Sequence, residues 1–198
     1  YSLLDGACRI DQLMDRVKEC GQTAIACTDH GVMYGCVQFY KAAKKAGVKP
    51  IIGCEVYVAT RTRFDKVNKI DGNNHLILLC KNETGYKNLC KMVSAAFVEG
   101  FYSKPRVDKQ LLEQYHEGLI CLSACLAGDY ERAKSSALWY QELFGVGNYY
   151  IELQDHGLEE DNIVLPQLIK LARETGIPMA ATNDSHYLRK EDAKMQAI

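Results

Sequence analysis

The chain has 198 residues, of which 47% are hydrophobic, and this length and composition are sufficient to bury a sizeable core within one domain. Lysine and arginine number 24 against 25 acidic residues, so the formal net charge of -1 excludes binding to nucleic acid through a strong overall positive field, although bound metal ions would reverse the potential locally. Nine scattered cysteines without a Cys-x-x-Cys pair are typical of free thiols in a reducing cytoplasm, and no apolar run approaches the ~20 residues of a membrane span, so we expect no membrane partner.

Hydrophobic periodicity and turn residues predict alternating helices and strands along the chain. In order, we expect a helix at 8–20, a strand at 24–29, a helix at 36–47, a strand at 50–59, a polar loop or hairpin at 60–73, a strand at 74–81, a helix at 85–98, a basic and aromatic loop at 101–106, a short helix to residue 115 capped by Asp108, a strand at 118–124, a helix through Trp139 and Phe144, a strand at 149–153, a helix at 159–175 that Pro166 must kink or restart, and a strand at 178–183. This alternation predicts a largely parallel α/β fold.

The predicted strands resemble an incomplete barrel. Polar residues that gather from the ends of many strands are typical of a barrel, but six strands are too few to close one, and a strand before Tyr1 would make seven. The chain also begins without Met and ends within a helical pattern at residues 196–198. We therefore expect a single domain over residues 1–198 that is a fragment truncated at both ends.

Two of the predicted strands run from apolar residues into a carboxylate and a histidine. One ends with Asp29 and His30, and the other ends with Asp184 and His186. A metal-ligating imidazole needs rigid support, which the end of a buried strand provides. Either histidine alone is explained equally well as a strand cap with local hydrogen bonds. Two such ends with similar flanks favour a shared metal site.

The strand between them along the chain contains a carboxylate. Glu55 lies inside the predicted strand 50–59, where an unpaired buried charge would cost on the order of several kcal/mol, so Glu55 needs a cation. His75 lies at the start of the following strand rather than at its end. For His75 to join the same site, this strand must run opposite to its neighbours or enter at the rim of the site.

Four of the five histidines lie at strand edges beside acidic or amide residues. With nearby acidic and thiol residues they form a mixed set of nitrogen, oxygen and sulfur donors, namely Asp5, His30, Glu55, His75, Cys125, His156, Asp184 and His186. This set is too large for one tetrahedral zinc and suits two or three ions, which lie ~3.5–4 Å apart in enzymes that cleave phosphoesters. We therefore predict metal-assisted hydrolysis, since no Gly-rich phosphate loop or Ser-His-Asp nucleophile is evident.

The loop at 101–106 combines aromatic and basic side chains. Such side chains stack on bases and contact phosphates in single-stranded nucleic acids. Lys104 and Arg106 are therefore candidates for DNA contact. Ordinary surface exposure is the more frequent explanation for a segment this short.

Six motifs of the chain stand in a defined order: Tyr-Ser-Leu-Leu-Asp-Gly (1–6), Thr-Asp-His-Gly (28–31), Lys-Pro-Ile-Ile-Gly-Cys-Glu-Val-Tyr (49–57), Asn-His-Leu (74–76), Leu-Ser-Ala-Cys-Leu-Ala-Gly (122–128) and Ala-Thr-Asn-Asp-Ser-His (181–186). Together they resemble the polymerase-and-histidinol-phosphatase (PHP) domain, in the version found at the N-terminus of the alpha subunit of bacterial DNA polymerase III. The resemblance extends over essentially all 198 residues.

The resemblance implies a fold and a metal site. The implied fold is a distorted (β/α)7 TIM-like barrel, with its first strand absent from this chain. The implied cofactors are up to three divalent ions, zinc or manganese, and some members use them for 3′–5′ exonuclease proofreading. The family's ligands correspond to Asp5, His30, Glu55, His75, Cys125, Asp184 and His186, of which Asp5, His30, Glu55 and Asp184 would act catalytically through bound metal and water. His156 is a candidate for substrate binding.

The chain departs from the family at one point. The family begins with a strand that carries His-x-His, and this motif is absent from the sequence given. At most seven of the nine ligands are then present. We expect the chain alone to bind metal incompletely and to have little nuclease activity.

Three functions remain open. The chain is part of a DNA-directed DNA polymerase, a nucleotidyltransferase, and its metal site contributes proofreading at a single-stranded 3′ end of DNA. Alternatively, it is a structural module that stabilises the other polymerase domains and offers a surface to a proofreading exonuclease subunit. The third alternative is a stand-alone phosphatase for a small phosphate ester, although motif 1–6 and the loop at 101–106 resemble the polymerase branch. No palm-type carboxylate pair is visible, so nucleotide addition belongs to sequence elsewhere.

Overall fold

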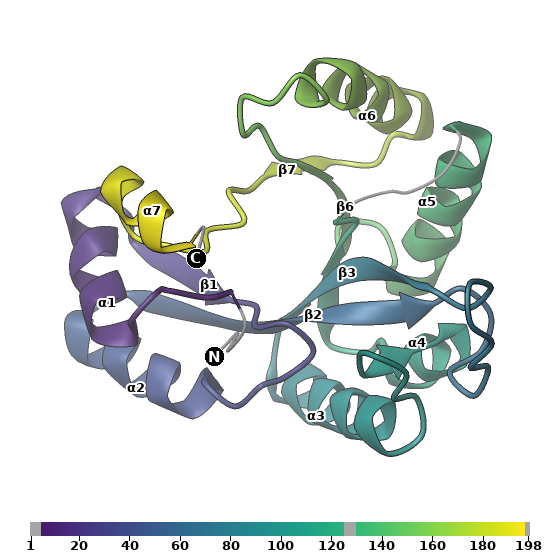
Figure 1. Cartoon of the computed structure of the whole chain (residues 1–198), viewed down its shortest axis with the longest axis horizontal. Coiled ribbons are helices and arrows are strands. Elements are labelled where there is room, and N and C mark those ends of the chain that lie inside the picture. Colours follow the sequence, from purple (N-terminus) through teal and green to yellow (C-terminus); the bar gives the residue numbers. More distant parts are fainter. Residues whose placement is uncertain (1–4, 125–129, 197–198) are drawn as a thin grey trace.

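The computed structural model describes residues 5–124 and 130–196 (Figure 1). Within these ranges the strands are β1 (Ala24–Cys27), β2 (Lys49–Ala59), β3 (Asn73–Cys80), β4 (Arg106–Val107), β5 (Leu119–Leu122), β6 (Tyr149–Leu153) and β7 (Met179–Ala181). The helices are α1 (Ile10–Glu19), α2 (Cys36–Ala46), α3 (Glu83–Val98), α4 (Lys109–Tyr115), α5 (Tyr130–Phe144), α6 (Asp161–Thr175), the 3-10 helix η1 (Lys190–Asp192) and α7 (Ala193–Gln196). The predicted alternation is confirmed, and the fold is α/β.

One curled sheet organises these elements, with strand order β1-β2-β3-β5-β6-β7 and β4 beside β2. The pairs are parallel except that β3 is antiparallel to both β2 and β5. An antiparallel strand is one of the two arrangements that the sequence analysis required for His75 to join the site. Figure 1 shows the helices on the outside of the curve, with α1 and α2 near β1, α3 and α4 near β2 and β3, and α5 and α6 near β6. Within the described residues β1 and β7 are not paired, so this sheet is a curled half-barrel rather than a closed ring.

The long strand β2 joins the two halves of the sheet. Residues 49–52 pair with β1, residues 53–59 pair with β3, and residues 57–58 pair with β4. The sequence analysis missed β4 and expected a loop there, because two residues are too few to show a periodic pattern. β4 continues the edge of β2 that β1 begins, so it brings the segment at 101–106 close to the end of β1.

The polar segment between β2 and β3 is the hairpin connection that the sequence predicted. Two hydrogen bonds of 2.7 Å join the Arg61 guanidinium to the Asp71 carboxylate across this connection. The Arg61 guanidinium lowers the pKa of Asp71 to about 2. Arg63 donates to Asp108 at 3.0 Å and to Glu99 at 2.6 Å, which fixes the connection to α4 and to the end of α3.

Two clusters of buried apolar side chains form the core. The larger cluster packs β2, β3, β5 and β6 against α3–α6 and includes Val56, Leu78, Leu89, Met92, Leu112, Cys121, Ile151 and Leu171. The smaller cluster lies between α1, α2 and β1 and contains Met14, Val17, Phe39, Ala43 and Val48. At roughly 25 cal/mol per Å² of apolar surface, this burial is the main stabilisation of the half-barrel.

The helix ends follow from local sequence. The Asp108 carboxylate accepts the Leu111 N–H at 3.1 Å and caps α4, as predicted, and the Asn82 side chain caps α3 in the same way. α6 continues through Pro166 without a restart. No helix in the described ranges has both the length and the apolar character that crossing a bilayer requires. All eight described cysteines are free.

Candidate metal centre

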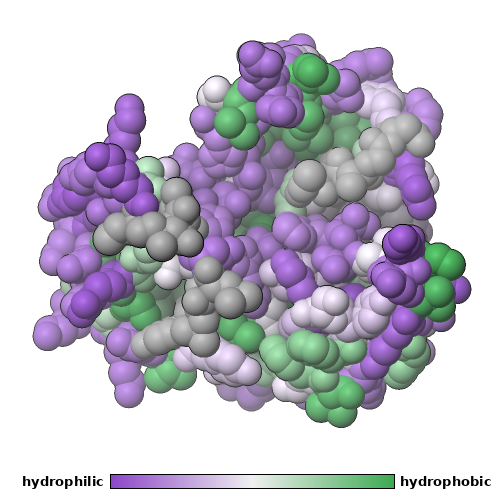
Figure 2. Space-filling view, viewed as in Figure 1, coloured by the Kyte–Doolittle hydropathy of each residue, from purple (hydrophilic) through white to green (hydrophobic). Residues whose placement is uncertain are grey.

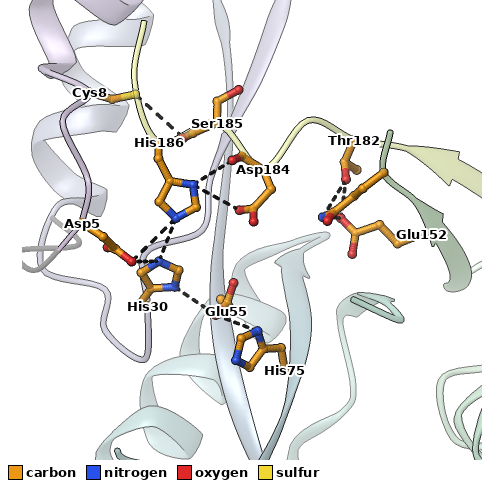
Figure 3. Close-up of polar contacts among 11 residues, drawn as sticks. Asp5, Cys8, His30, Glu55, His75, Glu152, Thr182, Asp184, Ser185 and His186 are labelled. Carbon is orange, nitrogen blue, oxygen red and sulfur yellow. Dashed lines mark hydrogen bonds and ion pairs between the residues drawn. The ribbon is translucent and has the colours of Figure 1, made fainter. Parts of the chain in front are cut away.

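Three predicted ligands from distant parts of the sequence converge at one point (Figure 3). Donor atoms of Asp5, His30 and His186 all lie within 4.8 Å of one another. The His30 Nε2 atom lies 3.2 Å from the Asp5 Oδ2 atom and 3.3 Å from the His186 Nε2 atom. The His186 Nε2 atom lies 3.7 Å from the same Asp5 oxygen. One carboxylate and two imidazoles thus face a common centre.

The Nδ1 atoms of His30 and His186 point away from this centre and contact other groups. The His30 Nδ1 atom lies 2.9 Å from the Glu55 Oε1 atom, and the His186 Nδ1 atom lies 2.8 Å from the Asp184 carbonyl oxygen. Both of these partners are acceptors, so each ring can donate its Nδ1 proton to them and turn its Nε2 atom toward the centre. When His30 is protonated, its Nε2–H faces the Asp5 carboxylate, and when the ring is neutral a divalent ion can take the place of that proton. The donor set therefore fits a divalent metal ion.

Glu55 supports this centre from inside the sheet. It is 5% exposed, and its Oε1 atom contacts both the His30 ring and, at 3.5 Å, the His75 Nδ1 atom. Burial alone would raise the pKa of Glu55, but the hydrogen bond from His30 and the charges of His75 and Lys104 outweigh burial and lower it. The same hydrogen bond raises the pKa of His30. A carboxylate that holds a ligating imidazole in this way fixes its tautomer and orientation.

Backbone pairing explains why His30 and Glu55 meet. Beyond the end of β1, His30 forms a parallel bridge with Glu55, and the Gly31 N–H donates to the Glu55 carbonyl at 2.8 Å. Gly31 has a φ of +67°, which favours glycine, and a Cβ atom there would lie 2.7 Å from the Cγ atom of Pro105. Gly31 therefore lets the loop before β4 approach the predicted ligand His30.

The predicted ligands after β7 lie on a more exposed segment. Asp184 has a positive φ of 44°, its side chain is 46% exposed, and its Oδ1 atom lies 3.8 Å from the His186 Nδ1 atom. The Ala7 N–H donates to the His186 carbonyl at 2.7 Å, which ties the segment that carries Asp5 to the segment that carries His186. Backbone contact between two distant segments therefore brings these ligands together.

These residues line an open cleft of about 1050 Å³. Its wall includes His30, Glu55, His75, Asp184 and His186. Figure 2 shows the cleft as the hollow between the left and upper parts of the molecule. Two of the three converging residues, His30 and His186, therefore lie on the wall of this cleft.

The remaining predicted residues lie elsewhere. Cys125 lies outside the described residues. The exposed His156 does not line the cleft, and its backbone N–H donates to the Asp161 carboxylate at 2.8 Å. The exposed Lys104 places its Nζ atom 4.2 Å from the centroid of the Tyr57 ring, close enough to lower the pKa of Glu55. Arg106 does not reach the surface on which DNA would bind, because its side chain is completely buried and its guanidinium donates to backbone carbonyls.

The sequence analysis missed one carboxylate of the cleft. Glu152 is buried at the end of β6 and lines the same cleft as His30 and Glu55. The signal that identified Glu55, an acidic residue inside a buried strand, applies equally to Glu152 in residues 149–153.

A scan against protein-family models matches the PHP domain over residues 1–156. The chain belongs to the PHP domain family. Curated relatives include the DNA polymerase III subunit alpha of Borreliella burgdorferi, 49% identical over the whole chain, and that of Treponema pallidum, 51% identical over the whole chain. The PHP chain spans only 18% of the length of either relative.

Solved structures share the fold of this PHP domain at low sequence identity. An amidohydrolase from Chromobacterium violaceum has a TM-score of 0.57 and 14% identity, with 97% of this chain and 87% of that chain covered. A protein from Bifidobacterium adolescentis, described as a metal-dependent phosphoesterase, has a TM-score of 0.59 and 12% identity, with 93% and 84% covered. These likenesses show that the half-barrel is similar in fold to PHP/amidohydrolase-type barrels.

Proposed function

We propose that this PHP domain is the N-terminal part of a bacterial replicative DNA polymerase and hydrolyses phosphodiester bonds at a single-stranded 3′ end of DNA. The observation that carries the proposal is the convergence of Asp5, His30 and His186, whose donor set fits a divalent cation. The relatives at 49% and 51% identity supply the polymerase setting. The free thiols of the eight described cysteines are consistent with a cytoplasmic location.

The proposed ligands divide into two groups. Asp5, His30 and His186 would hold one ion, and Glu55, His75, Asp184 and Cys125 would extend the site to two or three ions of zinc or manganese. Bound ions of this kind activate water and stabilise the attacking and leaving oxygens of a phosphodiester. The protein's own contribution is orientation, because Glu55 holds the His30 ring and the Asp184 carbonyl holds the His186 ring.

Two cationic or titratable residues are proposed to bind the substrate. The Lys104 ammonium lies next to Tyr57 and faces the negative charge of Glu55, so it would attract a phosphate that approaches the cleft. His156 is exposed and free to contact a strand that leaves the cleft. Arg106 is not part of this proposal, since its buried guanidinium holds the backbone of the hairpin connection.

The assembly around the domain is also proposed. The half-barrel is completed to a distorted (β/α)7 barrel by a strand between β1 and β7, and this strand carries the His-x-His motif of the family. The domain packs against the remaining polymerase domains and offers a surface to a proofreading exonuclease subunit.

The proposal is tested with a single-stranded DNA oligonucleotide labelled at its 5′ end. The full-length protein should shorten it from the 3′ end in the presence of Mn²⁺ or Zn²⁺, and Asp5→Asn should lower the rate by ~100-fold or more, since loss of a group that only supports a ligand already costs 10–100-fold. The control Asp15→Asn changes an exposed carboxylate on the outside of α1 and should leave the rate unchanged.

The other outcomes separate the alternatives. Hydrolysis of a small phosphate ester without hydrolysis of DNA would contradict the proposal and support a phosphatase. Full metal occupancy without any hydrolysis would support a structural module of the polymerase.

A further inference from the structure

The carboxylate of Glu152 has no part in the chemistry proposed above, although it is 4% exposed and lies on the wall of the cleft. It stands at the end of β6, between β5 and β7 in the sheet. The described hydrogen-bond donors to it are all uncharged: a backbone amide, a hydroxyl and a side-chain amide. A buried carboxylate is costly to retain, so its contacts indicate what it does.

These contacts join three neighbouring strand ends, and Figure 3 shows Glu152 beside Thr182. The Glu152 Oε2 atom accepts the Ala124 N–H at 3.0 Å, just beyond β5. The Oε1 atom accepts the Thr182 hydroxyl, just beyond β7, and the Gln154 Nε2 amide at 3.3 Å. The backbone N–H of Glu152 donates to the Ser123 Oγ atom at 2.9 Å. One side chain thus links β5, β6 and β7 where they leave the sheet.

The two segments that Glu152 holds lead directly into proposed ligands. Ala124 is followed in the sequence by Cys125, and Thr182 precedes Asp184 by two residues. Both Ala124 and Asp184 have positive φ values, 48° and 44°, which non-glycine residues adopt only when surrounding contacts hold them. Hydrogen bonds at Ala124 and Thr182 are contacts of this kind.

We infer that Glu152 is a positioning residue that holds the segment after β7, with the proposed ligands Asp184 and His186, in place for metal binding. The inference rests on the proposed metal site and deepens it, because it names the group that aligns that side of the site. Glu152 does not touch the converging donors of Asp5, His30 and His186, so its effect is transmitted through the backbone segment after β7.

Hydrogen bonding, rather than charge, is the property that this role requires. Glutamine at position 152 retains an oxygen that accepts the Ala124 N–H, and its amide donates to the Thr182 Oγ atom. Alanine at this position removes the side-chain oxygens that accept from the Ala124 N–H and the Thr182 hydroxyl. Glu152→Gln should therefore preserve the metal site that Glu152→Ala loses.

The test is a Mn²⁺ titration of the full-length protein, followed by the electron paramagnetic resonance signal of free Mn²⁺. Glu152→Ala should weaken metal binding by ~10–100-fold, the range for groups that orient metal ligands, and Glu152→Gln should bind with nearly the affinity of the unaltered protein. Glu159→Ala, which removes an exposed carboxylate on the loop before α6, is the matched control and should have no effect.

A second pair of variants keeps the test decisive if Glu152→Ala does not fold. Thr182→Val removes the hydroxyl donor at nearly constant volume and should weaken Mn²⁺ binding, whereas Thr182→Ser should restore it. Wild-type Mn²⁺ affinity in the folded Glu152→Ala and Thr182→Val variants would overturn the inference. Absence of Mn²⁺ binding by the unaltered protein would instead overturn the proposed metal site, so the two failures are distinguishable.

Discussion

The two sides of the candidate metal site differ in how they are supported. On one side, every residue from Gly53 to Ala59 in β2 is buried, and Glu55 and the adjacent His30 are aligned by sheet pairing. On the other side, no residue from Met179 to Lys194 is buried, and this segment carries Asp184 and His186. One half of the site is therefore held by the core, and the other half depends on hydrogen bonds and on the ligand.

This contrast assigns different roles to similar residues. Removing a residue from the buried side should lower the stability of the whole fold, because core packing and sheet pairing are lost together. Removing a residue from the exposed side should change metal binding first, because local opening there exposes little apolar surface. The following predictions test that division.

The largest effect on stability is expected for Arg106→Met. The Arg106 guanidinium donates to the carbonyls of Gly100, Arg63 and Asp65, and its loss leaves buried acceptors unpaired at ~1–3 kcal/mol each. We expect a loss of about 3 kcal/mol or more in the free energy of unfolding, measured by urea denaturation, with an unchanged number of bound metal ions. A variant of wild-type stability that binds DNA less tightly would contradict the buried role.

Removing the metal should act on the exposed side. At a metal concentration of 100 times Kd, binding stabilises the native state by about 2.7 kcal/mol, and chelation removes this amount. Amide hydrogen exchange should then become faster in residues 179–196 and stay slow in β2. Equal increases in both regions would show that the two sides of the site are not supported differently.

Gly31→Ala should have a smaller and more local effect. Gly31 and Gly21 both have positive φ values, of 67° and 68°, so alanine at either position adds strain of ~1–2 kcal/mol. Only at Gly31 does the new Cβ atom meet Pro105, whereas Gly21 has nothing within 4 Å. We therefore expect both variants to lose stability in thermal unfolding, but only Gly31→Ala to weaken metal binding. Equal metal affinity in the two variants would contradict this coupling.

The smallest expected effect is a change in pH dependence. Without metal, the raised pKa of His30 gives stability that is complete below its ordinary value of 6.5 and is lost as pH rises through the raised value. The lowered pKa of Glu55 gives stability that is complete above its ordinary value of 4.5 and is lost as pH falls through the lowered value. The pair therefore contributes most between pH 4.5 and 6.5.

Metal should reverse this trend at higher pH, because an imidazole must lose its proton to bind. Thermal unfolding between pH 4 and 9, with a chelator and with Mn²⁺, should show the stability maximum moving upward when metal is present. An optimum that does not move would contradict metal binding at His30.

The sequence predicted most of the fold because its elements follow local rules. Asp108 and Asn82 each cap a helix, and the polar hairpin connection separates two β-rich segments. The position of His75 at the start of its strand left two arrangements open, an antiparallel strand or entry at the rim of the site, and β3 is antiparallel to β2. The strand β4 was missed because its pairing depends on the distant residues 57–58 of β2 rather than on its own sequence.

The site residues were predicted from residue type alone. These predictions failed for two side chains that are buried in the folded chain. Arg106 was a candidate for DNA contact because its loop is basic and aromatic, yet the side chain lies in the core, where its Nε and Nη2 atoms donate to backbone carbonyls. Glu152 was missed because its partners come from three strand ends that are adjacent only in the folded sheet. Cys125 stays a prediction, since it lies outside the described residues.

The most direct test of the account is anomalous X-ray diffraction from crystals of the full-length protein grown with Mn²⁺ and measured at the manganese absorption edge. The account predicts an anomalous peak between the Asp5 Oδ2, His30 Nε2 and His186 Nε2 atoms, and no peak there in the His30→Ala variant. An empty centre at saturating Mn²⁺, with the three side chains in their present positions, would contradict the assignment of this cluster as a metal site.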